Sequence, residues 1–223
     1  MSQFKCLALE TATSHGSVVA CHGDQLAVAS LADSKTSSRE IFGVIERVLT
    51  ELDLQPAALD CIAYGCGPGS FTGVRVAASA AQGLAYANGL PVCRVSSLEA
   101  LAASVIDAES VSCVAACLDA RMGEAFLGVY SSTEEGELQC DFSDALINPQ
   151  EFRLIEHYPA AFAGGNGWDA WPDMLAGHSA GVNVDVWPEA AGVLQLARKQ
   201  FAAGIVIDAA NALPNYVRDN VTQ

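Results

Sequence analysis

The sequence predicts an α/β protein made of two similar halves, and three observations lead to this class. Hydrophobic residues make up 51% of the 223 residues and charged residues only 17%, which is enough apolar material for a sizeable core. Apolar runs of strand length alternate with segments whose apolar residues recur at helical spacing. The same order of segments recurs in the second half, which indicates a duplication.

The first half carries the clearer pattern. Its expected elements are strands at 4–9, 16–22 and 25–31, a helix from 37, a strand at 61–65, a helix at about 72–88, a strand at 91–95 and a helix from 96. Capping boxes open two of these helices, because Ser37 is followed by Glu40 and Ser96 by Glu99. Gly89 is expected to end the middle helix.

The second half repeats this order less clearly. Its expected elements are strands at 111–118, 124–131 and about 137–147, helices around 149–157, 168–176 and 189–204, and short strands near 160–163 and 182–186. An acid ends the first strand of each half, Glu10 in one and Asp119 in the other. Two such halves are typical of actin-like folds built from RNase-H-like lobes. We expect the lobes to be residues 1–102 and 103–223.

The charge of the chain excludes one class of function. Eleven basic and 26 acidic residues give a net charge of −15. Binding to nucleic acid or to anionic lipid on its own is therefore disfavoured, because both need Lys and Arg. Residues 1–100 carry a net charge of only −3, against −12 for residues 101–223. We therefore expect a protein interface in the first half.

Cysteine use and hydropathy indicate a reduced, soluble, cytoplasmic protein. Six of the eight cysteines lie in apolar, strand-like runs: Cys6, Cys21, Cys61, Cys93, Cys113 and Cys117. The sequence contains no C-x-x-C pair, so neither a zinc ribbon nor a thioredoxin-type site is expected. The N-terminus goes straight into a strand pattern, and no apolar run is long enough to span a bilayer.

The segment Gly65 to Arg75, GCGPGSFTGVR, is the most distinctive motif and lies between a strand and a helix. It is not a P-loop, because no Gly-Lys-Ser/Thr closes it. It departs from G-x-G-x-x-G at Thr72, and no acid follows the next strand to hold a ribose. It also fails G-x-S-x-G, which makes Ser70 a poor nucleophile. The structural interpretation is a tight turn with Thr72 as the helix N-cap.

This motif resembles the signature of the TsaB (YeaZ) family of bacterial tRNA-modification proteins. The likeness extends over the whole chain, through Glu10-Thr11-Ala12-Thr13, Gln82-Gly83-Leu84-Ala85, Leu118 to Glu124 (LDARMGE), Gly167-Trp168 to Trp171-Pro172, and Pro214 to Asn220 (PNYVRDN). The resemblance implies an actin/Hsp70/sugar-kinase-like (ASKHA) fold of two RNase-H-like lobes, each with a mixed sheet flanked by helices. The signature turn would be Gly67, Pro68, Gly69, Ser70, Phe71, Thr72 and Gly73.

The resemblance also implies a function and partners. Members act in the threonylcarbamoyl-adenosine modification of tRNA beside the anticodon, as the non-catalytic subunit that binds and activates the paralogous TsaD-type transferase. A TsaE-type ATPase is expected to join them, tRNA is expected only through the complex, and the isolated protein could form a homodimer. No cofactor, metal or membrane is implied.

The residues agree with a non-catalytic role. The metal site of the catalytic paralogue needs an H-x-x-x-H pair, and no two histidines here are four residues apart. Glu10, Thr11, Thr13 and Asp119 are the candidates for a vestigial phosphate or Mg²⁺ loop, and the alternative is a structural role at strand ends. Ala12 adds a Cβ where the backbone would have to approach phosphate. The family usually has Asp at the position of Glu10.

Two first-half helices are the candidate partner surface. On the first, Phe42 and Leu49 flank the apolar stripe of Ile41, Ile45, Val48 and Leu52, and the expected contact residues are Phe42, Ile45, Glu46 and Leu49. On the second, Arg75, Ser79, Gln82 and Tyr86 share a face, and Gly83 would let another helix come close. The resemblance implies that both helices pack against TsaD or a second copy. Ile41 stands where family members often have His, which removes one expected polar contact.

Arg75 and the choice of function leave alternatives open. A cation in the first turn of a helix opposes the dipole, so Arg75 is expected to pair either with an acid such as Glu10 or with a group on a partner. An ATP- and Mg²⁺-dependent kinase or ATPase of the same superfold is the alternative function, and it would need the loops at Glu10–Thr13 and Asp119–Gly123 to hold nucleotide. A glycopeptidase would need metal ligands or an activated nucleophile, and the sequence suggests neither.

Overall fold

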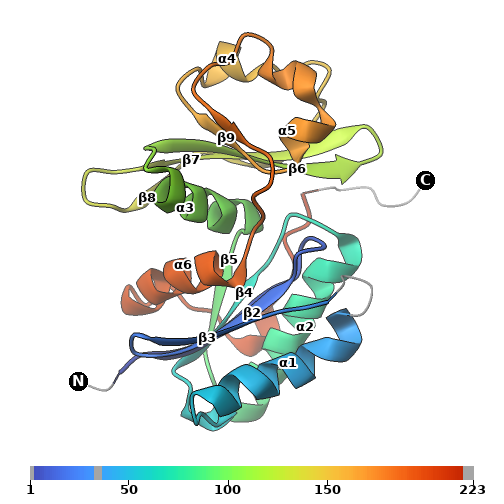
Figure 1. The fold of residues 1–223 in the computed structure, drawn as a ribbon. Coiled ribbons are helices and arrows are strands. Elements are labelled where there is room, and N and C mark those ends of the chain that lie inside the picture. The colour runs from blue at the N-terminus through green and yellow to red at the C-terminus, as the bar shows by residue number, and fades with distance from the viewer. Residues whose placement is uncertain (1–2, 33–36, 218–223) are drawn as a thin grey trace. The chain divides into compact units, whose positions relative to one another are not determined.

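The computed structural model describes residues 3–32 and 37–217, and their contacts divide into two compact units (Figure 1). One unit contains the residues up to Ala100 together with Pro188–Asn215, and the other is built on Leu101–Trp187. This division differs from the expected lobes 1–102 and 103–223, because the segment from 188 to 215 falls with the first unit. The change of unit at residue 100 is close to the expected boundary.

The first unit is built on a five-stranded mixed sheet. Its elements are β1 (Lys5–Glu10), β2 (Ser17–His22), β3 (Gln25–Ser30), α1 (Ser37–Glu51), the 3-10 helix η1 (Pro56–Ala58), β4 (Cys61–Gly65), α2 (Phe71–Asn88), β5 (Val92–Val95), α6 (Ala190–Ala202) and η3 (Ala209–Asn211). The strand order is β3-β2-β1-β4-β5, with β1 antiparallel to β2 and parallel to β4. The strands and helices expected in the first half are confirmed.

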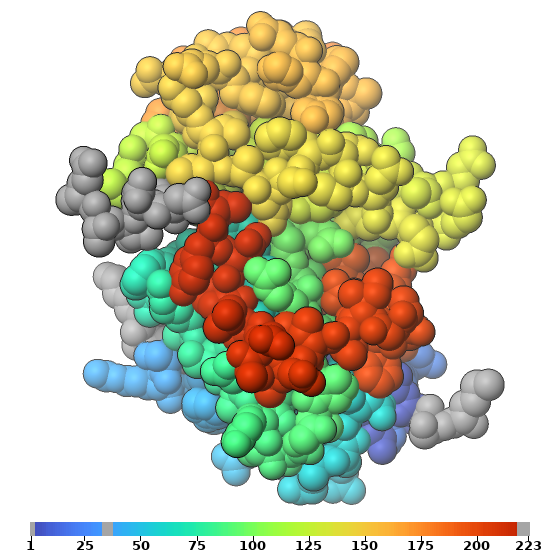
Figure 2. All heavy atoms as spheres, turned by 180° about the vertical axis from the view of Figure 1, so that it is seen from behind, coloured from blue at the N-terminus to red at the C-terminus, as the bar shows by residue number. Residues whose placement is uncertain are grey.

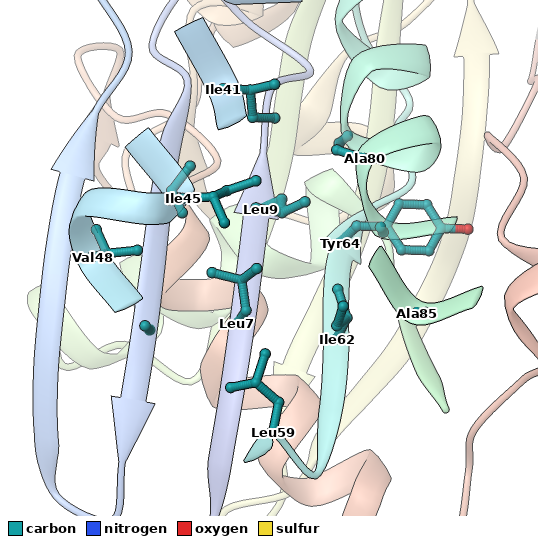
Figure 3. Close-up of a cluster of buried hydrophobic side chains, with 14 of the residues drawn as sticks. Leu7, Leu9, Ile41, Ile45, Val48, Leu59, Ile62, Tyr64, Ala80 and Ala85 are labelled. Atoms are coloured by element: carbon teal, nitrogen blue, oxygen red, sulfur yellow. The ribbon is translucent and has the colours of Figure 1, made fainter. Parts of the chain in front are cut away.

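Helices cover both faces of this sheet, which explains why β1 reads as a continuous apolar run. Leu7 and Leu9 join the cluster under α1 and α2, and Figure 3 shows Ile41 and Ile45 pointing from α1 toward them. The alternate residues Cys6 and Ala8 are also fully buried. On that other face α6 packs against β1, β2, β4 and β5.

The return of the chain at α6 completes the first unit. The Ala190 N–H donates to Ser17 Oγ (2.9 Å), and the rings of Phe4 and Phe201 lie 5.3 Å apart. Beyond α6, Val92 and Ile207 exchange two backbone hydrogen bonds of 2.9 Å. Figure 2 shows this last segment in red on the surface of the first unit. The apolar spacing of residues 189–204 predicted a helix, but it contained no information on which sheet that helix covers.

The second unit repeats the topology of the first. Its elements are α3 (Ser97–Glu109) from Leu101 onward, β6 (Cys113–Arg121), β7 (Glu124–Ser132), β8 (Leu138–Ile147), α4 (Leu154–His157), β9 (Phe162–Gly164), α5 (Gly167–Ala170), η2 (Pro172–Leu175) and β10 (Val182–Asn183). Read from β8, its strand order β8-β7-β6-β9-β10 corresponds to β3-β2-β1-β4-β5 of the first sheet, with β6 in the place of β1. The antiparallel pair β6–β7 and the parallel pair β6–β9 match β1–β2 and β1–β4.

The helices of the second unit are shorter than the sequence predicted. The expected helix at 149–157 is reduced to α4, and that at 168–176 is divided into α5 and η2 where Pro172 removes a backbone N–H. Trp168 anchors α5, because its Nε1 donates to the carbonyls of Ala115 (3.1 Å) and Gly164 (3.2 Å).

Two further findings concern the chain as a whole. The eight cysteines, all of which lie among the described residues, are not joined by disulfide bonds. In the part of the chain that the structure describes, no helix has the length and apolar character needed to cross a membrane.

Candidate functional site

The signature turn, residues 67–73, connects β4 to α2. The Gly67–Pro68 peptide bond is cis, and Gly67 has a φ of +97°, a conformation that favours glycine. Ser70 caps α2, since its Oγ accepts from the Gly73 N–H at 3.4 Å. The prediction of Thr72 as N-cap is therefore wrong. Thr72 already lies inside the first turn of α2, which begins at Phe71.

The signature turn packs directly on the loop after β1. The Ser70 N–H donates to the Ala12 carbonyl (2.7 Å), and the Thr11 hydroxyl donates to the Gly73 carbonyl (2.7 Å). A Cβ at Gly73 would lie 1.9 Å from the Thr11 carbonyl oxygen. Glycine is therefore required at position 73, where the backbone of α2 approaches the backbone of the loop after β1. The close approach is to the protein's own chain and not to a ligand.

Glu10 points into the interior and not toward solvent. Its side chain is fully buried, Oε1 accepts from the Ala12 N–H (2.6 Å), and Oε2 accepts from the Ser97 hydroxyl (2.8 Å). A Cβ at Gly65 would lie 1.8 Å from Oε2, so the space for the carboxyl depends on that glycine. Burial raises the pKa of Glu10 to about 7, against the lowering effect of its hydrogen bonds.

The other candidates for a phosphate or Mg²⁺ loop also have partners of their own. Thr13 Oγ1 accepts from the His15 N–H (3.2 Å). In the second unit, Asp119 accepts from the Arg121 N–H (2.9 Å) and forms an ion pair with its guanidinium (3.0 Å). Among residues 3–32 and 37–217, no three His, Cys, Asp or Glu side chains are grouped to hold a metal ion. These contacts favour the structural role at strand ends.

A groove of about 360 Å³ lies between α1 and α2. It is lined by Ser38, Ile41 and Phe42 of α1 and by Phe71, Thr72, Arg75, Val76, Ser79 and Ala80 of α2. Phe42 and Phe71 are each 56% exposed. Two half-exposed aromatic rings beside an apolar groove form a surface of the kind that proteins use to bind one another.

Arg75 has partners inside its own helix. Its Nη1 donates to the Phe71 carbonyl (2.8 Å), and its guanidinium carbon lies 3.3 Å from the centre of the Phe71 ring. The carbonyl and the ring offset the unfavourable position at the helix N-terminus. The expected ion pair with Glu10 is not the arrangement found, because the Glu10 carboxyl is held by Ala12 and Ser97.

The remaining residues of the predicted partner surface divide into two groups. Glu46, Ser79 and Tyr86 are exposed, Gln82 is partly exposed and donates to the Ala210 carbonyl (3.4 Å), and Gly83 has open space around its Cα. Ile45 and Leu49 are buried in the core, at 3% and 4% exposure. Assigning them to the partner surface was wrong.

Helical spacing explains why Leu49 is buried and why Phe71 belongs to the exposed face of α2. Leu49 lies four residues after Ile45, so it belongs to the buried stripe and not to a flank. The sequence motif places Phe71 in the signature turn. Yet Phe71 lies four residues before Arg75, and the same spacing would have assigned it to the exposed face of α2.

Comparison with known proteins gives concordant matches. The family model for TsaD, described as tRNA N6-adenosine threonylcarbamoyltransferase, matches residues 30–159. The tRNA threonylcarbamoyladenosine biosynthesis protein TsaB of Haemophilus influenzae is 31% identical, over 100% of this chain and 97% of its own length. Its Escherichia coli namesake is 30% identical over 97% and 96%. The structure of YeaZ from Pseudomonas aeruginosa superposes with a TM-score of 0.89 at 31% identity, covering 96% of this chain and all of that one.

Two units with the same RNase-H-like strand order define a protein of the actin/Hsp70/sugar-kinase-like (ASKHA) class. Within that class, its first-strand loop is covered by a Gly-rich turn. The near full-length matches go one step further: the chain belongs to the TsaB (YeaZ) family.

Proposed function

We propose that this chain is a non-catalytic subunit that serves tRNA threonylcarbamoyladenosine biosynthesis by binding and activating a TsaD-type transferase. The observation that carries the proposal is the apolar groove between α1 and α2, with Phe42 and Phe71 half-exposed beside it. The names of the full-length relatives supply the pathway.

The groove suits a helical partner. Tyr86 is 81% exposed farther along α2, and Gly83 lies next to the same face with no atom near its missing Cβ. A helix can approach closely where a side chain is absent, while the aromatic rings supply buried area at the contact. A TsaD-type subunit is the proposed occupant in the complex, and a second copy of the chain is the proposed occupant in isolation.

The geometry of the loops argues for a binding role over the kinase-like alternative. In the first unit, the backbone of the loop after β1 is already hydrogen-bonded to the signature turn. Glu10 faces the interior, so its carboxylate is not directed toward a nucleotide. Nucleotide chemistry and tRNA contacts are therefore assigned to the partners, the TsaD-type transferase and a TsaE-type ATPase.

Two substitutions on the exposed faces of α1 and α2 test the proposal. Phe42→Ala removes an anchor and should weaken binding to the TsaD-type subunit by about 2 kcal/mol, roughly 30-fold in Kd. Gly83→Leu should hold the partner helix away sterically. Leu26→Ala on β3 is the matched control, because Leu26 is a similarly exposed apolar side chain (52%) on a different element. Binding is measured by isothermal titration calorimetry.

Circular dichroism and the melting temperature of each variant serve as the folding controls. Phe42 is exposed and Gly83 has open space around it, so both variants should fold as the wild type does. If both fold and still bind the TsaD-type subunit as tightly as the wild type, the interface lies elsewhere and the assignment of the groove is wrong.

A further inference from the structure

Glu10 lies at the centre of the contacts that hold the signature turn. Its Oε1 accepts from the Ala12 N–H (2.6 Å), and the Ala12 carbonyl accepts from the Ser70 N–H (2.7 Å). Its Oε2 accepts from the Ser97 hydroxyl (2.8 Å), and Ser97 Oγ also accepts from the Gly67 N–H (3.2 Å). One carboxyl group therefore reaches both the beginning and the middle of the turn, each through a single residue.

The surroundings of this carboxyl are fully buried and uncharged. The groups around it are the peptide N–H groups of Thr11 and Ala12, the backbone of Gly65 in β4, and the hydroxyl of Ser97 at the start of α3. The charged or titratable side chains on the adjacent strands are directed elsewhere. Tyr64 and Arg94 donate to the Leu213 carbonyl, and Cys66 contacts the Gly67 carbonyl.

We propose that Glu10 is a positioning residue for the groove between α1 and α2, and that loss of its proton loosens the signature turn from which α2 begins. The consequence for partner binding rests on the proposed function. The turn leads directly into Phe71, and Arg75 lies over the Phe71 ring, so one wall of the groove starts where the turn ends.

The two protonation states differ in charge and in the direction of the hydrogen bond between Glu10 Oε2 and Ser97, whose hydroxyl donates to the carboxylate and accepts from the protonated carboxyl. A serine hydroxyl has two lone pairs, so Ser97 Oγ can accept from both Gly67 and a protonated Glu10. The ionised carboxylate keeps its two donors but remains buried without a cation, which is unfavourable. Opening the turn would admit water to the carboxylate and relieve that cost. The raised pKa of Glu10, about 7, places the change of state near neutral pH.

The test compares the wild type with Glu10→Gln, which keeps the shape of the protonated side chain and cannot ionise. Affinity for the TsaD-type subunit is measured by calorimetry at pH 6 and pH 8. If only the protonated form binds, the Kd of the wild type rises about tenfold over this range. The Kd of Glu10→Gln should change much less. Glu151→Gln, which removes an exposed acid of the second unit, should retain the wild-type profile.

A readout that needs no partner follows the turn itself. The amide chemical shifts of Gly67 and Ser70 should titrate with a midpoint near pH 7 in the wild type and not in Glu10→Gln. All proteins carry His15→Gln, which leaves no histidine in the loop after β1. Ser97→Ala is the second variant, and it should weaken binding at pH 6 toward the value of the wild type at pH 8.

The outcomes separate the two proposals. If the wild type binds the TsaD-type subunit equally well at both pH values and the turn amides do not titrate, Glu10 has no positioning role and the proposed function stands. If the amides titrate but no binding occurs at either pH, the role of Glu10 in the turn stands and the proposed function fails.

Discussion

Glu10 illustrates how one side chain can be used inside a fold instead of at its surface. The carboxyl is fully buried at the end of β1, with the missing side chain of Gly65 making room for it. Its acceptor atoms are directed to the protein's own N–H and O–H donors. The group therefore influences the stability of the chain as well as the arrangement of the signature turn.

The pH dependence of stability is the prediction at this scale. The pKa of Glu10 is raised from 4.5 to about 7 in the folded state, so between these values the folded chain holds a proton that the unfolded chain has lost. The free energy of unfolding should therefore fall as the pH rises from about 4.5 to 7, by up to about 3 kcal/mol, and then level off.

Urea denaturation of the wild type and Glu10→Gln at pH 5, 6, 7 and 8 measures this effect. The difference in stability between the two proteins should shift in favour of Glu10→Gln as the pH rises through this range. A constant difference across the four pH values would show that folding does not raise the pKa of Glu10.

At the scale of elements, the sequence predicted where helices and strands occur better than what they cover. Helical spacing predicted α1 and the buried stripe of Ile41 and Val48. The same stripe contains Leu49, which lies four residues after Ile45 and was wrongly placed on its flank. The position of α6 on the first sheet depends on a contact between residues 190 and 17, which no local pattern encodes.

The hairpin between β6 and β7 contains a methionine whose replacement should stabilise the second unit. Its two-residue loop, Met122-Gly123, has positive φ at both positions (55° and 84°), as in a type I′ turn. Methionine is strained there, whereas asparagine is tolerated. Met122→Asn should therefore stabilise the second unit by about 1 kcal/mol. Thermal denaturation measures the change.

Met122→Ala is the matched control for the hairpin. It removes the same 86%-exposed side chain, but alanine is strained at positive φ as methionine is and lacks the local hydrogen bonding of asparagine. The melting temperature of Met122→Ala should therefore stay near that of the wild type. Equal stabilisation by Ala and Asn would assign the effect to the lost methionine and not to the backbone.

The net charge of the whole molecule predicts that the isolated protein does not bind tRNA. A net charge of −15 leaves few cations to displace counterions from tRNA. The isolated protein should therefore give no gel shift with tRNA at physiological salt, and tRNA should be retained only when the partner subunits are added. A shift at sub-micromolar concentration of the protein alone would contradict this.

The duplicated architecture was predictable at this scale, because both halves repeat the same order of strands and helices along the chain. The strand orders match, with β6 in the place of β1, but Glu10 ends β1 whereas β6 continues two residues beyond Asp119 to Arg121. What the repeat left open was the exchange of a segment between halves, since a helix after the second lobe can cover either sheet.

The inclusion of Pro188–Asn215 in the first unit affects how the chain folds while it is being synthesised on the ribosome. The main segment of the second unit, Leu101–Trp187, is continuous, whereas the first unit needs Pro188–Asn215 to cover one face of its sheet. Proteins are synthesised at about 5–20 residues per second, so several seconds pass between the synthesis of β5 and that of α6. The later-made unit can thus fold while the earlier-made one still exposes Cys6, Ala8 and their neighbours. That interval is when a nascent chain of this protein is most open to chaperones.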